Sequence, residues 1–185
     1  MGLAQRKYAY ISEEDYLQGE EYSDVRHEYI DGHVYAMAGS SDKHNQITLN
    51  AGTFFNTHLP DECEVFVADM KVRVQLQRSV RFYYPDAVVS CAENDNATYY
   101  RTQPCLIVEV LSKATERQDR GEKFWNYQQI PSLQEYLLLK QDVKEAMLFR
   151  RLTGWQPEVY REGNIRLDSV GLDMPLDDLY RRVQL

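Results

Sequence analysis

Long apolar segments are missing from this sequence of 185 residues. No window approaches the roughly 18 consecutive apolar residues that a membrane-spanning helix needs, and residues 1–16 contain no apolar stretch typical of a signal peptide. A myristoylation signal is also missing, because Arg6 stands where Ser or Thr is required. We therefore expect a soluble, cytoplasmic protein that does not contact a membrane.

Cysteine is scarce, and Cys63, Cys91 and Cys105 lie far apart in the sequence. An odd number of cysteines without a CxxC pair is untypical of both a disulfide framework and a zinc site. We expect three free, mostly buried thiols, as in a protein of a reducing compartment.

Internal repeats, low-complexity tracts and linker-like segments are also absent. Hydrophobic residues make up 43% of the sequence, which is enough for a core and too many for a chain that stays disordered. A chain of this length is typical of one domain. The prediction is a single domain over residues 1–185.

Positive charge is in deficit, and the net charge is −8. Proteins that bind nucleic acids usually present a basic face to the phosphates, so this acidity argues against such a role. The charge is uneven, however. Residues 1–62 hold 4 Lys and Arg against 11 Asp and Glu, whereas residues 63–185 hold 17 against 18. The objection is therefore weaker for a site built mainly from residues 63–185.

Hydrophobic periodicity predicts a mixed α/β architecture of the α+β type. Alternating or continuous apolar runs indicate strands, spacing of three and four residues indicates helices, and Asp31-Gly32 and Gly163-Asn164 are typical of hairpin turns. We predict a central mixed sheet flanked by helices, with antiparallel hairpin extensions. The expected helices cover residues 12–18, 22–27, 41–57, 116–129 and 175–180, and the expected strands cover 28–30, 33–37, 86–90, 105–111, 135–139 and 146–150, with two more within 64–76.

Two carboxylates are the main candidates for chemistry. Glu109 lies inside the apolar run 105–111, where a buried carboxylate is costly unless a metal, a basic side chain or several hydrogen bonds compensate it. Asp86 follows Pro85 and opens another expected strand. Carboxylates on neighbouring strands can converge on one cation, and oxygen ligands completed by water and phosphate suit Mg²⁺. Such a cation can polarise a phosphodiester and activate water for its hydrolysis.

The segments around these two residues resemble a known family. YYPDAVVS and LIVEVLS, which place Glu109 23 residues after Asp86, resemble the PD…(D/E)xK core of the restriction-endonuclease-like superfamily. Within it, the chain is similar to the Uma-two family of bacterial restriction endonucleases. The resemblance extends through EYIDGHVYAMAGSSDKHNQI, TERQDRGEKFWNYQQIPSLQEYLLL and Trp155. It implies a restriction-endonuclease-like fold, magnesium or manganese held by Asp86 and Glu109, DNA as the partner, and a homodimer.

The lysine of that core belongs two residues after the glutamate, a position that Leu111 occupies here. The resemblance implies that the following helix supplies it, which points to Lys123. Lys113 is a second candidate, because it would share a strand face with Glu109 if the strand continued. Similar sequences usually carry proline at that position, so Lys123 ranks first. An ammonium group there could orient or help to deprotonate the attacking water, or neutralise charge on the phosphate.

Four further residues complete the predicted site. Related nucleases often add an acidic residue from an early element, for which Glu28 is the candidate. His44, near the start of the helix 41–57, could ligate the metal, bind phosphate or shuttle a proton. Ser112 and Arg120, together with Lys113, are candidates for contacts with phosphate oxygens.

Each residue also has a purely structural interpretation. Glu109 could form a buried ion pair without a metal, Asp86 could be a turn residue, and Lys123 could be a solvated helix residue. The leading hypothesis is an endonuclease that hydrolyses DNA phosphodiester bonds with metal-activated water. The alternatives are a nucleic-acid-binding or assembly module with little catalysis, and a metal-dependent hydrolase of a small phosphorylated substrate. A basic groove leading to a shared cleft would favour DNA.

Overall fold

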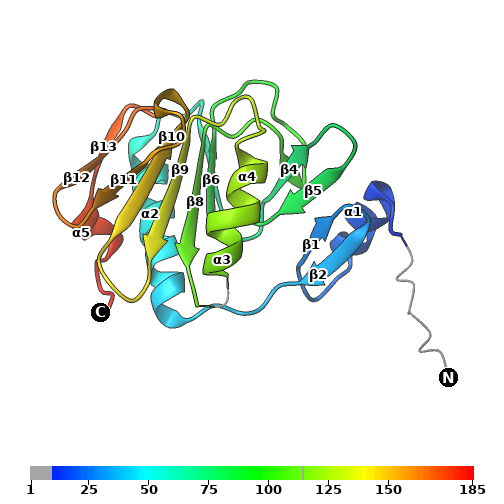
Figure 1. The fold of residues 1–185 in the computed structure, drawn as a ribbon, viewed down its shortest axis with the longest axis horizontal. Coiled ribbons are helices and arrows are strands. Elements are labelled where there is room, and N and C mark those ends of the chain that lie inside the picture. Colours follow the sequence, from blue (N-terminus) through cyan, green and yellow to red (C-terminus); the bar gives the residue numbers. More distant parts are fainter. Residues whose placement is uncertain (1–9, 114) are drawn as a thin grey trace.

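The computed structural model describes residues 10–113 and 115–185, which form two large sheets covered by helices (Figure 1). The larger sheet has six strands in the order β11-β10-β9-β8-β6-β3. Its β8 and β9 are parallel and its other neighbours are antiparallel, so the predicted mixed sheet is confirmed. Its strands are β3 (Glu64–Val67), β6 (Ala87–Ser90), β8 (Leu106–Leu111), β9 (Glu135–Lys140), β10 (Ala146–Arg150) and β11 (Pro157–Tyr160).

The smaller sheet extends this core and has five strands in the order β2-β1-β5-β4-β7. The predicted turn at Asp31-Gly32 joins β1 to β2, and both residues have the positive φ that a tight hairpin requires. Tyr16 of α1 (Glu13–Glu21) packs on this sheet, with its ring centroid 4.9 Å from that of Tyr29. The prediction of a second short helix over 22–27 is wrong, because residues 22–26 form no helix and β1 already begins at His27. The strands are β1 (His27–Ile30), β2 (His33–Ala36), β4 (Lys71–Gln75), β5 (Val80–Tyr83) and β7 (Tyr100–Arg101).

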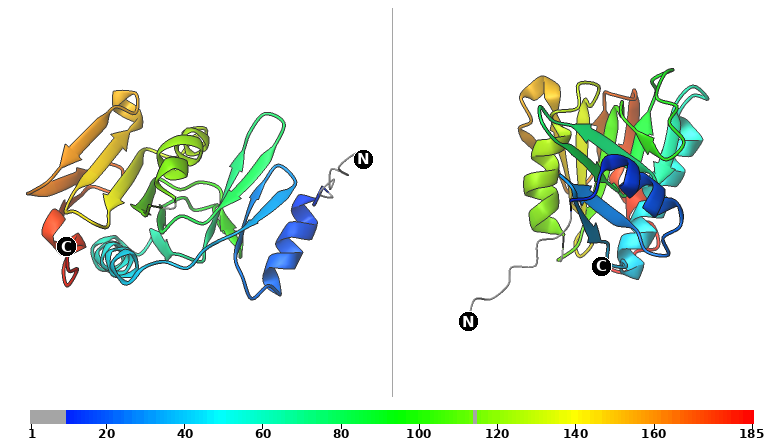
Figure 2. Two further views of the ribbon diagram at one scale, coloured as in Figure 1. Left: turned by 60° about the horizontal axis from the view of Figure 1, so that its bottom comes forward. Right: turned by 90° about the vertical axis from the view of Figure 1, so that its right-hand side faces the viewer.

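Helices cover both faces of the larger sheet (Figure 2). Val108 and Val110 pack with α2, whereas Ile107 and Leu111 pack with the helical run that follows β8. Because side chains alternate along a strand, Glu109 points toward that helical run. No helix in the described part of the chain is long and apolar enough to cross a membrane. The helices that cover the larger sheet are α2 (Asp42–His58) on one face and, on the other, the helical run of α3 (Glu116–Gln118), the π-helical segment η1 (Asp119–Lys123) and α4 (Phe124–Tyr127).

The C-terminal part contains one wrong prediction, the hairpin around Gly163-Asn164. β11 pairs with β10 instead, and β12 pairs with β13 in a separate two-stranded sheet. The apolar side chains of Ile165 and Leu167 join the core beneath α2, which draws β12 away from β11. A short helix follows Pro175, as predicted. The bounds are β12 (Asn164–Leu167), β13 (Leu172–Pro175), α5 (Leu176–Leu179) and the 3₁₀ segment η2 (Arg151–Thr153).

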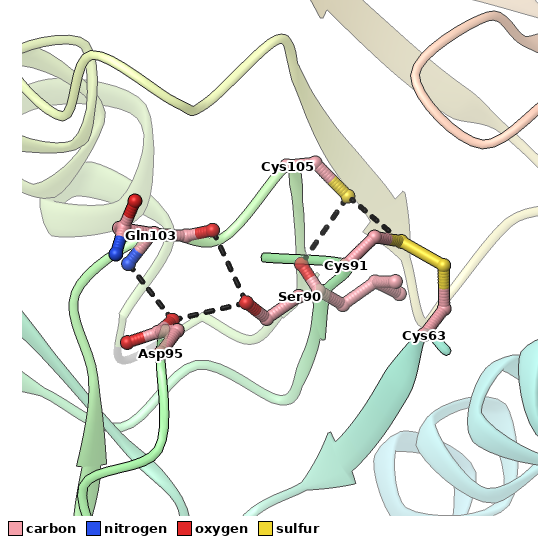
Figure 3. Close-up of a disulfide and its surroundings, with 7 residues drawn as sticks. Cys63, Ser90, Cys91, Asp95, Gln103 and Cys105 are labelled. Atoms are coloured by element: carbon pink, nitrogen blue, oxygen red, sulfur yellow. Dashed lines mark hydrogen bonds between the residues drawn. A yellow bond between two sulfur atoms is a disulfide. The ribbon is translucent and has the colours of Figure 1, made fainter. Parts of the chain in front are cut away.

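The prediction of three free cysteines is wrong, because Cys63 and Cys91 form a disulfide (Figure 3). The antiparallel register of β3 and β6 pairs Glu64 with Ser90, so the next positions outward are 63 and 91. Their Cα atoms lie 4.1 Å apart. Cys105 remains a free thiol, and burial raises its pKa to about 11. Cysteine usage therefore no longer argues for a reducing compartment.

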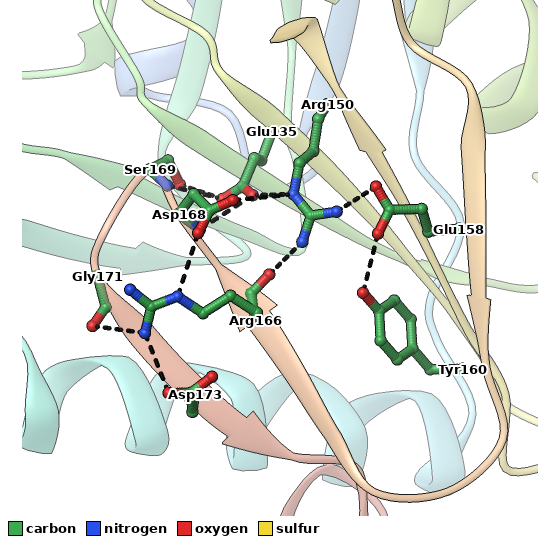
Figure 4. A network of polar contacts seen from close by, with 9 residues as sticks. All are labelled: Glu135, Arg150, Glu158, Tyr160, Arg166, Asp168, Ser169, Gly171 and Asp173. Carbon is green, nitrogen blue, oxygen red and sulfur yellow. Dashed lines mark hydrogen bonds and ion pairs between the residues drawn. The ribbon is translucent and has the colours of Figure 1, made fainter. Parts of the chain in front are cut away.

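A buried charged network holds the C-terminal part of the larger sheet together (Figure 4). Glu135 of β9 accepts a hydrogen bond from Arg150 Nε of β10 at 2.9 Å. It also accepts hydrogen bonds from the backbone of Asp168 and Ser169 and from the Ser169 hydroxyl. Arg150 further contacts Glu158 of β11 and donates to the carbonyl of Arg166. The network thus fastens the β12–β13 turn to the sheet.

Candidate active site

A cleft of about 1290 Å³ lies between the β1–β2 hairpin, the start of α2 and the helical run over the larger sheet. Its floor receives side chains from both large sheets, because the chain passes from β5 to β6 at this point. The predicted site residues that line it are Glu28, His44, Asp86, Glu109, Ser112 and Lys123.

Asp86 and Glu109 lie side by side because β6 and β8 are antiparallel neighbours. Asp86 Oδ2 accepts a hydrogen bond from the backbone N–H of Val110 at 2.6 Å. In return, Glu109 Oε2 accepts one from the backbone N–H of Asp86 at 3.4 Å. These reciprocal bonds fix both carboxylates at the same level of the sheet.

Lys123 reaches this pair from η1. Its Nζ lies 2.7 Å from Glu28 Oε1, 3.4 Å from Asp119 Oδ1 and 3.6 Å from Glu109 Oε1. Burial alone would lower the pKa of Lys123, but these three carboxylates outweigh burial and raise it. The three carboxylates therefore favour the charged form of Lys123.

Glu109 is the most strongly perturbed acid of the cleft. Burial raises its pKa well above the usual value, and Lys123 offsets only part of that effect, since neighbouring carboxylates add to it. The Tyr127 hydroxyl donates a hydrogen bond to Glu109 Oε1 at 3.3 Å. A carboxyl group with a displaced pKa on the floor of a cleft is typical of functional sites.

His44 approaches from the first turn of α2, which Ser41 caps. Its Nε2 lies 3.2 Å from Asp86 Oδ2. Burial opposes the charged imidazole, but the hydrogen bond with Asp86 and the charge of Asp86 prevail, and the pKa of His44 is raised. Asp86 therefore favours the charged form of His44.

The other predicted residues lie at the edge of the site or away from it. Lys113 is exposed beyond the end of β8 and does not line the cleft. Arg120 forms an ion pair with Glu116 at 2.7 Å and also lies outside the lining. Ser112 is in the lining, 3.0 Å from the Thr115 hydroxyl. The geometry therefore favours Lys123 over Lys113 as the lysine of the site.

Three residues of the site escaped the sequence-based prediction. Asp119 is 2% exposed and lies beside Lys123, Gln118 donates a hydrogen bond to Glu28 Oε2 at 3.3 Å, and Tyr127 contacts Glu109. The four-residue spacing from Asp119 to Lys123 in an expected helix was the available signal for Asp119. Nothing local distinguishes Gln118 or Tyr127 from ordinary helix residues.

The residues of the cleft fit a hard divalent cation. Glu28, Glu109 and Asp119 surround one ammonium group, so the buried charges have an acidic excess, and Asp119 Oδ1 accepts no hydrogen bond from the described residues. Within residues 10–113 and 115–185, no three His, Cys, Asp or Glu side chains already form a metal-binding group. Two carboxylates completed by water and a substrate phosphate match the preference of Mg²⁺.

The lining of the cleft as a whole is acidic. It contains eight Asp and Glu residues against three Lys and Arg residues. The basic residues of β4 and β5 do not form a free stripe, because Arg73 pairs with Glu13 at 2.6 Å and Arg81 with Glu122 at 3.1 Å. A basic groove leading into the cleft is therefore not part of this lining.

Fold and family now define the class of protein. The structure resembles a "putative nuclease" from Anabaena variabilis ATCC 29413, with a TM-score of 0.71 and 16% sequence identity, over 88% of this chain and 93% of that one. The two proteins therefore share a fold. The family model described as "Uma2: Putative restriction endonuclease" matches residues 13–177, and the chain belongs to this family. The predicted family is confirmed.

Two proteins of Synechocystis sp. (strain ATCC 27184 / PCC 6803 / Kazusa) are similar in sequence. The first, slr1290, is 39% identical over 176 residues, which cover 92% of each chain. The second, sll1609, is 39% identical over 131 residues, which cover 69% of this chain and 73% of the relative.

Proposed function

We propose that this protein is a metal-dependent endonuclease that hydrolyses DNA phosphodiester bonds. One observation carries the proposal: Asp86, Glu109 and Lys123, from three separate segments, converge on the floor of one cleft. Burying this acidic excess costs stability, and costly buried charges in a cleft are typical of functional sites.

The residues take distinct roles in this proposal. Asp86 and Glu109 would hold Mg²⁺ or Mn²⁺, a cation that polarises the phosphate and makes water a better nucleophile. Lys123, whose charged form the neighbouring carboxylates favour, would neutralise negative charge that develops on the phosphate. Glu28 holds the ammonium group at 2.7 Å, and His44, whose Nε2 lies 3.2 Å from Asp86 Oδ2, would pass a proton to or from the reacting groups.

A homodimer belongs to the proposal, because cutting both strands of a duplex calls for two active sites related by symmetry. The acidic lining supports a second candidate function, the hydrolysis of a small phosphorylated substrate. A single phosphate needs no extended basic surface, whereas a duplex does.

The test compares wild type with Glu109→Gln on supercoiled plasmid, labelled single strands and a small chromogenic phosphodiester. Each substrate is incubated with Mg²⁺, Mn²⁺ or a chelator. Nicking that needs a divalent cation and is lost in the variant supports the endonuclease. Turnover of the chromogenic ester without plasmid cleavage supports the second candidate instead. A well-folded wild type that acts on none of them contradicts both.

A further inference from the structure

The π-helical segment η1 begins at Asp119 and ends at Lys123. Four α-helical residues advance about 400°, so side chains at positions 119, 123 and 127 of a regular helix would drift by about 40° per step. A π turn holds more residues per turn, so four of its residues rotate by less than one full turn. This deficit offsets the drift of the α-helical turn that follows. Asp119, Lys123 and Tyr127 therefore lie on one stripe that faces Glu109.

Contacts along this stripe agree with that geometry. The Tyr127 hydroxyl lies 3.3 Å from Glu109 Oε1, and Lys123 Nζ lies 3.6 Å from the same oxygen. Asp119 lies one step further along and reaches Nζ at 3.4 Å. Its backbone carbonyl accepts a hydrogen bond from the Tyr136 hydroxyl at 2.9 Å, which fixes the π turn to β9.

Asp119 is an unusual residue for a structural role alone. It is 2% exposed and lines the cleft, yet its Oδ1 accepts no hydrogen bond from the described residues. A buried carboxylate oxygen that accepts no hydrogen bond is costly. The Lys123 ammonium group lies 3.4 Å from Oδ1 and compensates its charge.

Lys123 is held from a second side by Glu28 of β1, which belongs to the other large sheet. Gln118 in turn donates to Glu28 Oε2 and orients that carboxylate. A lysine has a flexible stem, so a single carboxylate would leave the ammonium position loosely defined. Two carboxylates on different elements define it closely.

We propose that Asp119 is a positioning residue which, with Glu28, holds the Lys123 ammonium group toward Glu109 and the reacting phosphate. The role rests on the proposed nuclease function, although the clamp itself is a property of the fold. Neither carboxylate of the clamp needs to touch substrate.

The kinetic test compares Asp119→Asn with Asp95→Asn. Asp95 is a matched control, since it is 3% exposed and accepts hydrogen bonds from Ser90, Thr102 and Gln103 away from the cleft. We expect Asp119→Asn to lower kcat about 10- to 100-fold with KM nearly unchanged, because misplaced catalytic groups cost that much. Asp95→Asn should lower the melting temperature and leave kcat unchanged below it. An unchanged kcat in folded Asp119→Asn overturns the proposal.

A second readout does not depend on cleavage. In ¹⁵N-labelled protein, a clamped and buried lysine ammonium group gives a slowly exchanging Nζ signal, which Lys123→Met assigns by its loss. We expect Asp119→Asn to broaden or abolish this signal and Asp95→Asn to keep it. Persistence of the signal in Asp119→Asn overturns the clamp. If wild type cleaves nothing but folded Asp119→Asn still loses the signal, the clamp is supported and only the nuclease function is refuted. If Asp119→Asn does not fold, Glu28→Gln provides the same two tests.

Discussion

Two buried charged clusters lie in this protein, one on the cleft floor and one around Arg150, and they are balanced differently. In the second, the buried charges pair one to one, because Glu135 is matched by Arg150 and receives four hydrogen bonds. In the first, three carboxylates whose side chains are 2–9% exposed share the single ammonium group of Lys123. The remaining acids around Arg150 are more than a third exposed, so water compensates them.

We propose that this difference separates a structural cluster, around Arg150, from a functional one, on the cleft floor. Glu135 has all its hydrogen bonds and its counter-ion within the protein, so it needs no external ligand. The acidic excess on the cleft floor, by contrast, attracts a cation. Glu135 and Glu109 lie on neighbouring parallel strands and are about equally buried, so they form a natural pair for experiments. The following changes should separate the two clusters.

The largest effect is expected from Glu109→Gln. Cleavage should fall by at least about 10³-fold, because the change removes a proposed ligand and its charge from the centre of the site. Plasmid nicking under single-turnover conditions measures this. Glu135→Gln should destabilise the fold but leave the rate per folded molecule unchanged. A Glu109→Gln protein that cleaves within tenfold of wild type would remove Glu109 from the centre.

Arg150→Met should lower the free energy of unfolding by about 3–5 kcal/mol, because it leaves Glu135 charged, buried and without its cation. Urea denaturation followed by circular dichroism gives the value. The proposed active site should keep its activity below the lowered melting temperature. A loss under about 1 kcal/mol would mean that the hydrogen bonds from Ser169 and Asp168 suffice for Glu135.

Removing the divalent cation should act on the cleft cluster alone. At a Mg²⁺ concentration of about 100 times Kd, wild type should gain about 2.7 kcal/mol over the chelated protein. Arg150→Met should gain as much, and Glu109→Gln should gain little. Thermal unfolding with Mg²⁺ and with chelator checks all three. Equal stabilisation of Glu109→Gln would locate the cation elsewhere.

The two clusters should respond to pH with opposite signs. Burial raises the pKa of Asp119 above its ordinary 3.8, so its contribution to stability is present below that value and is lost as pH rises through the folded pKa. The hydrogen bond from Arg150 lowers the pKa of Glu158 below 4.5, so its contribution is present above that value and is lost as pH falls. Urea denaturation in chelator from about pH 3 to about pH 7 should therefore show converging stabilities of wild type and Glu158→Gln on the acid side. Wild type should lose stability relative to Asp119→Asn as pH rises. The same sign for both variants would refute this account.

The smallest effect is expected from Lys113→Ala. Lys113 is exposed and outside the cleft, so cleavage should change less than about twofold. Lys123→Ala should lower it about 100-fold or more, since it removes the charge beside the phosphate. Initial rates on one labelled substrate compare the two directly. If Lys113→Ala lowered the cleavage rate more than Lys123→Ala does, the ranking of the two lysines would be reversed.

Local patterns predicted much of the fold. The strands at 86–90, 105–111, 135–139 and 146–150 are close to β6, β8, β9 and β10, because apolar periodicity is a local property of the chain. The helix expected over 116–129 is present but contains a π turn, and no local signal marks that turn. The tail was mispredicted because strand pairing is decided by which core the apolar side chains enter.

For the site, Glu109 was predictable because a single charge interrupts an apolar run. The convergence of Glu28, His44 and Lys123 was expected only through family resemblance, and their joint placement around the cleft depends on three different elements. Asp119 was missed because a helical aspartate usually faces water, and only the fold buries it.

By itself, the sequence determined the hydrophobic periodicity and order of the helices and strands, the family, and the carboxylate of Glu109 within an apolar run. Each of these depends on residues that are close together in the chain. Tertiary structure alone decided the Cys63–Cys91 disulfide, the pairing of Arg73 with Glu13 and the acidic excess around Lys123. These depend on the register of strands and on contacts between distant segments. A charge has no fixed energy until the fold decides whether water, a counter-ion or another carboxylate lies beside it.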